Sequence, residues 1–179
     1  AFDSCKSLEA VLIPSSVEVL ERGVFEECDA LKFVKLPKGI TEIADRLFFG
    51  CRNLSSVFYA NNIKRIGVSS FLGAGLKQLP SMESLEYISD FAFASSKLTH
   101  FNFLPSLKYI GSEAFTRSNL KEIAILGRVE FIGHAAFAFC DKVTKVSLAE
   151  GVREIQAKAF FNQNYDSISL PASLDRFDS

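Results

Sequence analysis

A phenylalanine recurs every 22 or 23 residues along the whole chain, at Phe2, Phe25, Phe48, Phe71, Phe93, Phe115, Phe137 and Phe160. A repeat of this length is typical of a solenoid, in which each coil buries its apolar side only by stacking on its neighbours. The spacing therefore predicts one domain over residues 1–179, with about eight coils of which the first and last are incomplete. The phenylalanines are expected to form the spine of a continuous interior.

Each period also contains two short segments with apolar residues at fixed positions. In the first segment the apolar residues alternate, as do Val34 and Leu36. Alternation with period two places them on one side of a strand, and stacking of the coils then makes a parallel sheet. The second segment has a pair such as Ile63 and Ile66 and is too short for a regular helix. We interpret it as a turn, a second extended piece and one helical or 3₁₀ turn that inserts the phenylalanine.

Two further residue types keep a fixed position relative to the repeated phenylalanine. Alanine precedes it in Ala1-Phe2, Ala92-Phe93, Ala114-Phe115, Ala136-Phe137 and Ala159-Phe160. Cysteine follows it three residues later at Cys5, Cys28, Cys51 and Cys140. The repeat therefore resembles the BspA-like class of leucine-rich repeats, whose unit of 23 residues ends in Ala-Phe and is followed by Cys. The resemblance implies an α/β solenoid, a right-handed leucine-rich repeat coil. It would have one parallel β-sheet face, with short strands, turns and 3₁₀ or helical turns on the other sides.

Composition restricts the classes of partner. The net charge of −1 gives no basic surface for a nucleic acid, and no apolar run is long enough to insert into a membrane. Neither end has the atypical polar repeat that caps a solenoid. We therefore expect the sequence to be a segment of a longer protein.

The sequence gives no sign of a catalytic, cofactor or metal site. The four cysteines share one repeat position and have no Cys-x2-Cys pairing, so free thiols in the core are expected. A disulfide between neighbouring coils stays open as an alternative, because adjacent coils lie within disulfide range. The two histidines, His100 and His134, are predicted on different flanks, and the carboxylates are scattered. We predict a chain that is not an enzyme.

Two strips of exposed side chains are the candidate protein-binding residues. On the outward side of the first segment the candidates are Leu12, Phe33, Lys35 and Phe58. On the second segment they are Tyr87, Tyr109 and Phe131, which recur every 22 residues and should form an aromatic ladder. Contiguous exposed aromatic residues tend to mark interaction sites. The alternative is that the rings only pack on one another along the solenoid.

The predicted function is a non-enzymatic scaffold that binds another protein. The resemblance implies a surface or secreted module that acts in adhesion and binds host or matrix proteins. The alternative is an intracellular, cytoplasmic scaffold component that assembles with other proteins, including by end-to-end stacking of solenoids. No cofactor is expected in either case.

Overall fold

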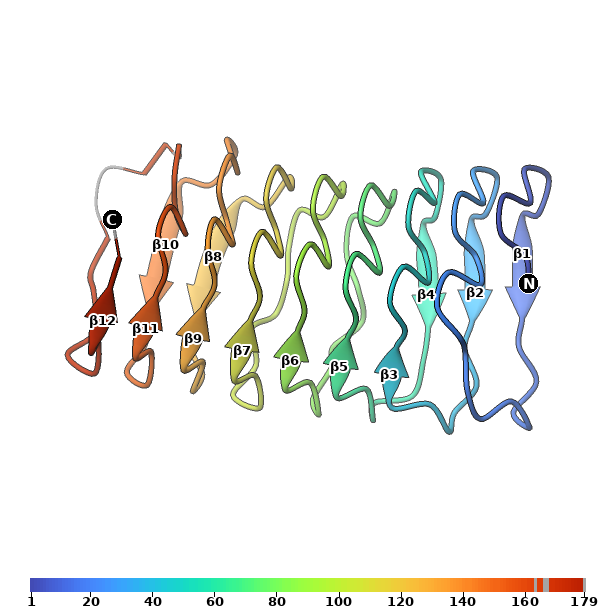
Figure 1. The fold of residues 1–179 in the computed structure, drawn as a ribbon, viewed down its shortest axis with the longest axis horizontal. Helices are drawn as coiled ribbons and strands as arrows, with labels where there is room; N and C mark the ends of the chain where they lie inside the picture. The colour runs from blue at the N-terminus through green and yellow to red at the C-terminus, as the bar shows by residue number, and fades with distance from the viewer. Residues whose placement is uncertain (163, 166–167, 179) are drawn as a thin grey trace.

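The chain winds into a parallel β-solenoid in a computed structural model that describes residues 1–162, 164–165 and 168–178. The coils stack along one axis, and the two termini lie at opposite ends of it (Figure 1). The described residues form twelve strands of two to four residues, and every strand pair is parallel. The predicted parallel stacking of strands from successive coils is confirmed on two faces of the solenoid, with an interruption on the first.

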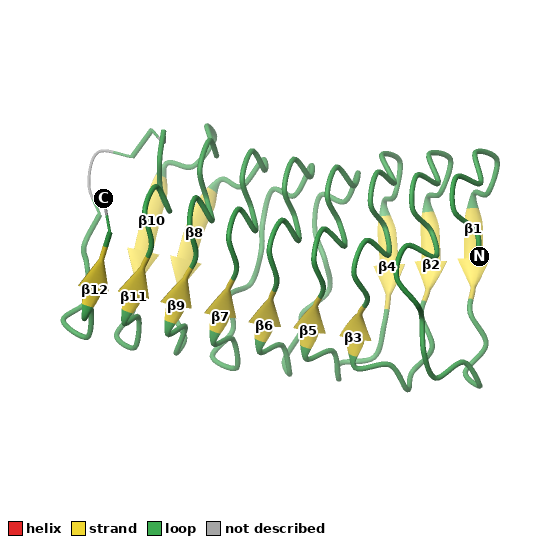
Figure 2. Ribbon diagram, in the orientation of Figure 1, coloured by secondary structure: helices red, strands yellow, loops and turns green. Residues whose placement is uncertain are grey.

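The first face carries the alternating segment and is divided into two small sheets. One sheet has three strands, β1 (Ala10–Leu12), β2 (Phe33–Lys35) and β4 (Ser56–Phe58). The other has two, β8 (Glu122–Ile125) and β10 (Lys145–Leu148). Figure 2 shows these strands at the two ends of the face with only loop between them.

The second face carries the longest sheet. Its seven strands are β3 (Glu42–Ile43), β5 (Arg65–Ile66), β6 (Tyr87–Ile88), β7 (Tyr109–Ile110), β9 (Phe131–Ile132), β11 (Glu154–Ile155) and β12 (Arg176–Phe177). In all but β12, the second residue of each pair is a buried isoleucine. The predicted second extended piece is confirmed. The prediction of a single sheet face was wrong, because this second row of pairs also closes into a hydrogen-bonded ladder.

Proline explains where the first face loses its sheet. Pro80 occupies the same repeat position as Phe58 in the coil before it, and proline has no N–H to donate to a neighbouring strand. Within the described chain, no backbone hydrogen bond joins residues 55–59 to residues 77–81. One coil later, Phe101 and Phe103 turn inward and meet the edge of the Phe115 ring, at centroid distances of 5.2 and 5.5 Å. A proline followed by bulky inward rings therefore replaces two strands.

The repeated phenylalanines form the predicted spine. Seven successive pairs from Phe2 to Phe160 are stacked, with ring centroids 5.1–5.8 Å apart. The six inner rings are buried, whereas Phe2 is 45% exposed and Phe160 is half-buried. Stacked rings at this spacing contribute beyond the area that they bury. The spine joins every coil to the next.

Each inner spine phenylalanine lies in a tight turn and not in a helical turn. Around Phe71, for example, Ser69 and Gly73 both have positive φ angles, of 54° and 69°. The N–H groups of these three residues donate to carbonyl oxygens of the next coil, at 2.8–3.0 Å. A helical turn would direct such N–H groups along its own axis. The described residues contain no helix, so the predicted helical turns and the α/β character are not confirmed.

Truncation of an inner ring should weaken the whole stack. We expect Phe115→Ala to lower the free energy of unfolding by about 3–5 kcal/mol, because it opens a cavity in a fully packed spine. Phe2→Ala is the matched control and should cost much less, since that ring is already half exposed. Chemical denaturation of the two variants measures the difference, and equal losses would contradict a stacked interior.

The left-handed turn residues allow a second stability test. Ser95 is exposed with a φ of 55°, a conformation that disfavours side chains with a Cβ. We expect Ser95→Gly to raise the free energy of unfolding by up to about 1 kcal/mol. The control is Ser147→Gly in β10, where glycine should instead cost about 0.5–1 kcal/mol. Thermal or chemical unfolding distinguishes these opposite signs, and destabilisation by both changes would contradict the turn geometry.

Candidate protein-binding surfaces

The first candidate surface is the strand-face patch, defined as Leu12, Phe33, Lys35 and Phe58. Strand pairing aligns Leu12, Lys35 and Phe58 in one outward row. Leu12 is 69% exposed and Phe58 is 50% exposed. Phe33 is half-buried, and its ring lies 5.2 Å from that of Phe58 with a tilt of 40°. The structure thus brings all four predicted residues onto three neighbouring strands.

Charge on this patch is low. Lys35 is exposed and forms no ion pair with another described residue. The nearest charged pair on the same face is Lys32 with Glu9, at 3.0 Å between Nζ and Oε2. The patch therefore combines exposed apolar area with one cation that is available to a partner.

A groove lies beside the patch, between β4 and the coil that contains Pro80. Its volume is about 360 Å³, and its lining is Ser55, Ser56, Val57, Phe58, Gln78, Leu79 and Pro80. The groove occupies the place where the first sheet is interrupted. Sequence reasoning missed it, although a proline in an alternating segment was a signal that the ladder would break there.

The second candidate surface is the aromatic ladder, defined as Tyr87, Tyr109 and Phe131. These residues are aligned in register on β6, β7 and β9. The rings of Tyr109 and Phe131 are stacked, with centroids 4.8 Å apart and planes 1° apart. Tyr87 is 44% exposed and lies 6.4 Å from Tyr109 at a tilt of 42°. The ladder exists as predicted, and Tyr109 and Phe131 each bury one face of the ring against the other.

Charged side chains bound the ladder on the same sheet. Arg65, one strand before Tyr87, forms ion pairs with Glu42 and Asp45. On the other side, Arg176 lies 3.8 Å from Glu154, which is one strand beyond Phe131. Burial raises the pKa of the Tyr109 hydroxyl, and the Asp90 carboxylate adds to this effect. Tyr109 is therefore neutral at physiological pH.

The histidines do not form a site together. His100 is exposed on the first face, where its Nδ1 lies 2.9 Å from Thr99 Oγ1. His134 is in the turn before Phe137, and its backbone N–H donates to the Gln156 side chain at 3.1 Å. Among the described residues, no group of three His, Cys, Asp or Glu side chains is arranged to hold a metal ion. None of the described segments is a helix that could cross a bilayer.

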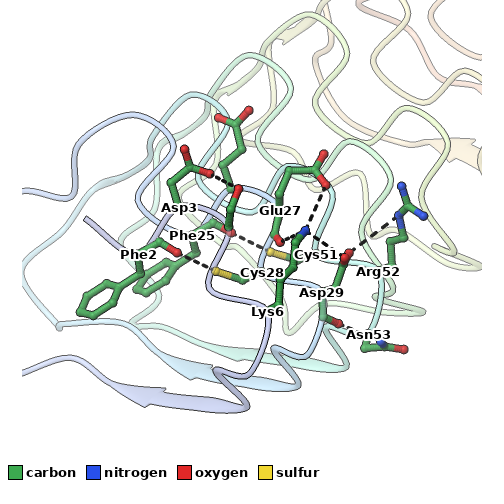
Figure 3. A network of polar contacts seen from close by, with 12 residues as sticks. Phe2, Asp3, Lys6, Phe25, Glu27, Cys28, Asp29, Cys51, Arg52 and Asn53 are labelled. Carbon is green, nitrogen blue, oxygen red and sulfur yellow. Dashed lines mark hydrogen bonds and ion pairs between the residues drawn. The ribbon is translucent and has the colours of Figure 1, made fainter.

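Three of the four cysteines have the same structural role. All four are free thiols, as predicted. The Cys28 thiol donates to the Phe2 carbonyl at 2.9 Å, and the Cys51 thiol donates to the Phe25 carbonyl at 3.0 Å (Figure 3). Cys140 makes the same bond to Phe115 at 3.1 Å. These three thiols thus add a hydrogen bond to the spine carbonyl of the preceding coil, which the sequence analysis had not predicted.

Polar side chains near these thiols also connect successive coils. Lys6 Nζ lies 3.0 Å from Asp29 Oδ2, and the Asn53 side chain donates to the Asp29 carbonyl at 2.8 Å (Figure 3). Arg52 approaches Asp29 at 3.9 Å. Exposed ion pairs of this kind contribute little to stability.

Comparison with known proteins shows the family. A family model of the BspA-type leucine-rich repeat region matches residues 1–121 and 108–179. The chain therefore belongs to the BspA-type leucine-rich repeat family. No curated protein matches it.

Solved structures share the fold at low sequence identity. A leucine-rich cell surface protein from Faecalibacterium prausnitzii is 22% identical with a TM-score of 0.59, over 97% of this chain and 44% of that one. A leucine-rich repeat protein from Eubacterium ventriosum is 14% identical with a TM-score of 0.52, over 99% of this chain and 77% of that one. The chain thus spans less than half the length of the first of these proteins.

Thiol reactivity tests the cysteine geometry. Burial raises the pKa of Cys51 from 9.0 to about 12, with a smaller contribution from neighbouring Cys28, and burial also raises the pKa of Cys140. We expect a disulfide reagent at pH 8 to label half-buried Cys5 first and to reach Cys51 and Cys140 only on unfolding, because the thiolate is the nucleophile. Mass spectrometry of labelled peptides measures the order. Rapid labelling of Cys51 in the folded chain would contradict it.

The same pKa shift has a consequence for stability. The unfolded chain loses the Cys51 proton near pH 9, whereas the folded chain keeps it to about pH 12. The contribution of the Cys51 thiol to the free energy of unfolding is therefore fully present below pH 9 and decreases as the pH rises from 9 towards 12. Unfolding measurements on Cys51→Ser, in which this titration is missing, provide the control.

Proposed function

We propose that this chain is a non-enzymatic protein-binding module that engages its partner through the strand-face patch. The observation that carries the proposal is the exposure of Leu12 and Phe58 in one row of a parallel sheet, with Phe33 in contact beside them. Rigid aromatic side chains contribute contact area at little entropic cost. Membership of a repeat family that generally binds proteins supports the proposal.

The patch is the better of the two candidate surfaces. In the aromatic ladder, Tyr109 and Phe131 are half-buried and stacked on each other, so mainly Tyr87 is left to a partner. In the patch, Phe58 and Leu12 are both at least half exposed. The geometry of Tyr109 and Phe131 favours the packing interpretation, so the proposal rests on the patch alone.

We place the module at the cell surface or in secreted material, with a host or matrix protein as partner. The similarity to a cell surface protein from Faecalibacterium prausnitzii supports this location. Protease treatment of intact cells that make the full-length protein tests it. Digestion of the repeats on intact cells is the expected result, whereas protection until lysis would favour the cytoplasmic scaffold.

A pair of matched variants tests the binding surface. Screening of purified matrix and host surface proteins against the wild-type chain first provides a binder. We then expect Leu12→Ser with Phe58→Ser to weaken binding at least tenfold, because apolar contact area at the centre of the interface is lost. Biosensor titrations measure this affinity, and thermal melts verify the fold.

The control is Tyr87→Ser with Tyr109→Ser, which should change affinity less than threefold. Unchanged affinity in the Leu12 and Phe58 variant, with its melting temperature intact, would exclude the patch. A large loss only in the ladder variant would move the site to the second face.

A further inference from the structure

The peptide group of Val57 faces the interrupted part of the first sheet. Ser56 N–H donates to the Lys32 carbonyl at 3.1 Å, and Leu36 N–H donates to the Phe58 carbonyl at 2.8 Å. Ser56 and Phe58 therefore direct their peptide groups to β2. Because peptide groups alternate along a strand, the N–H and C=O of Val57 point the other way, towards the coil with Pro80.

Nothing in that coil pairs with Val57. Pro80, at the position that would donate to the Val57 carbonyl, has no N–H. The Pro80 carbonyl accepts the Tyr59 hydroxyl at 2.6 Å. No backbone–backbone hydrogen bond joins residues 77–81 to residues 55–59 in the described chain. Yet Val57 is only 2% exposed, and buried peptide groups without a partner are rare in folded proteins.

The groove beside Val57 has fixed ends. On one side, Gly75 N–H donates to the Cys51 carbonyl at 3.1 Å. On the other side, Glu83 N–H donates to the Asn61 side chain at 2.8 Å. These bonds hold the two coils together above and below the gap. The groove is therefore part of the folded structure, and its volume of about 360 Å³ is within the range of ligand pockets.

The lining of the groove indicates the chemistry of its ligand. The lining combines apolar residues, including Phe58, Leu79 and Pro80, with polar but uncharged residues, which are Ser55, Ser56 and Gln78. At the floor, Val57 offers one hydrogen-bond donor and one acceptor. In an antiparallel pair, a single residue of one strand satisfies both groups of its opposite residue. An uncharged extended peptide has the complementary groups.

We propose that this groove, next to the strand-face patch, binds an uncharged extended segment of the protein partner. One residue of that segment exchanges two backbone hydrogen bonds with Val57, as in the addition of a strand to a sheet edge. Its neighbouring side chains lie against Phe58 and Pro80. The inference rests on the proposed function, since it names the part of the partner that the first face recognises.

The test uses a capped, uncharged pentapeptide, acetyl-Ser-Thr-Val-Thr-Ser-amide, and the isotope-labelled chain. We expect saturable changes in the amide signals of Val57 and Tyr59 during an NMR titration at millimolar peptide. The matched control peptide carries an N-methyl group on its valine, which removes the donor to the Val57 carbonyl, and it should bind at least tenfold more weakly. The absence of any signal change, or equal binding of both peptides, would overturn the proposal.

A protein variant gives a second, independent arm. Pro80→Val supplies the missing N–H, so we expect it to pair with the Val57 carbonyl, to slow amide exchange in residues 55–59 and to weaken peptide binding at least tenfold. Peptide binding at the wild-type level in a folded Pro80→Val chain would overturn the proposal. The Pro80→Val change leaves Leu12 and Phe33 unaltered. If this variant no longer bound the peptide but kept full affinity for the protein partner, only the present inference would be contradicted. The proposed function would then stand.

Discussion

The stack of phenylalanine rings is the interaction on which the rest of the structure depends. Each coil is too short to bury its own apolar residues, so its stability comes from contact with the coils on either side. The inner rings are buried and lie 5.1–5.8 Å from their neighbours in the spine. The N–H of a spine residue, as at Phe93, also donates to the next coil. Ring stacking and backbone pairing therefore act at the same place.

The periodicity of the sequence was sufficient to predict the spine, the coil boundaries and the first row of strands. It also placed Phe33 beside Phe58, and Tyr87, Tyr109 and Phe131 in one ladder. These predictions succeed because a repeat position fixes a position in the stack. Any side chain therefore has its counterpart one coil away as a neighbour, whatever the details of the turn.

The errors came from the backbone, which side-chain periodicity does not describe. A helical turn was predicted around each phenylalanine, but residues such as Ser69 and Arg46 adopt positive φ there, and neither residue type signals this in a sequence. The interruption of the first sheet depends on Pro80 and on the inward rings of Phe101 and Phe103. These residues occur in individual coils only, so the repeat pattern does not predict their effect. The thiol bonds to spine carbonyls were missed because cysteine was treated only as a small apolar residue.

Amide hydrogen exchange of the spine residues tests the central claim most directly. In a continuous stack, the amides of Phe48, Phe71, Phe93 and Phe115 donate between coils and exchange only when neighbouring coils separate. Their protection should match that of buried strand residues such as Val34. Exchange of these amides at the rate of an exposed residue such as Lys38 would mean that the rings do not form one shared interior, and the account would fail.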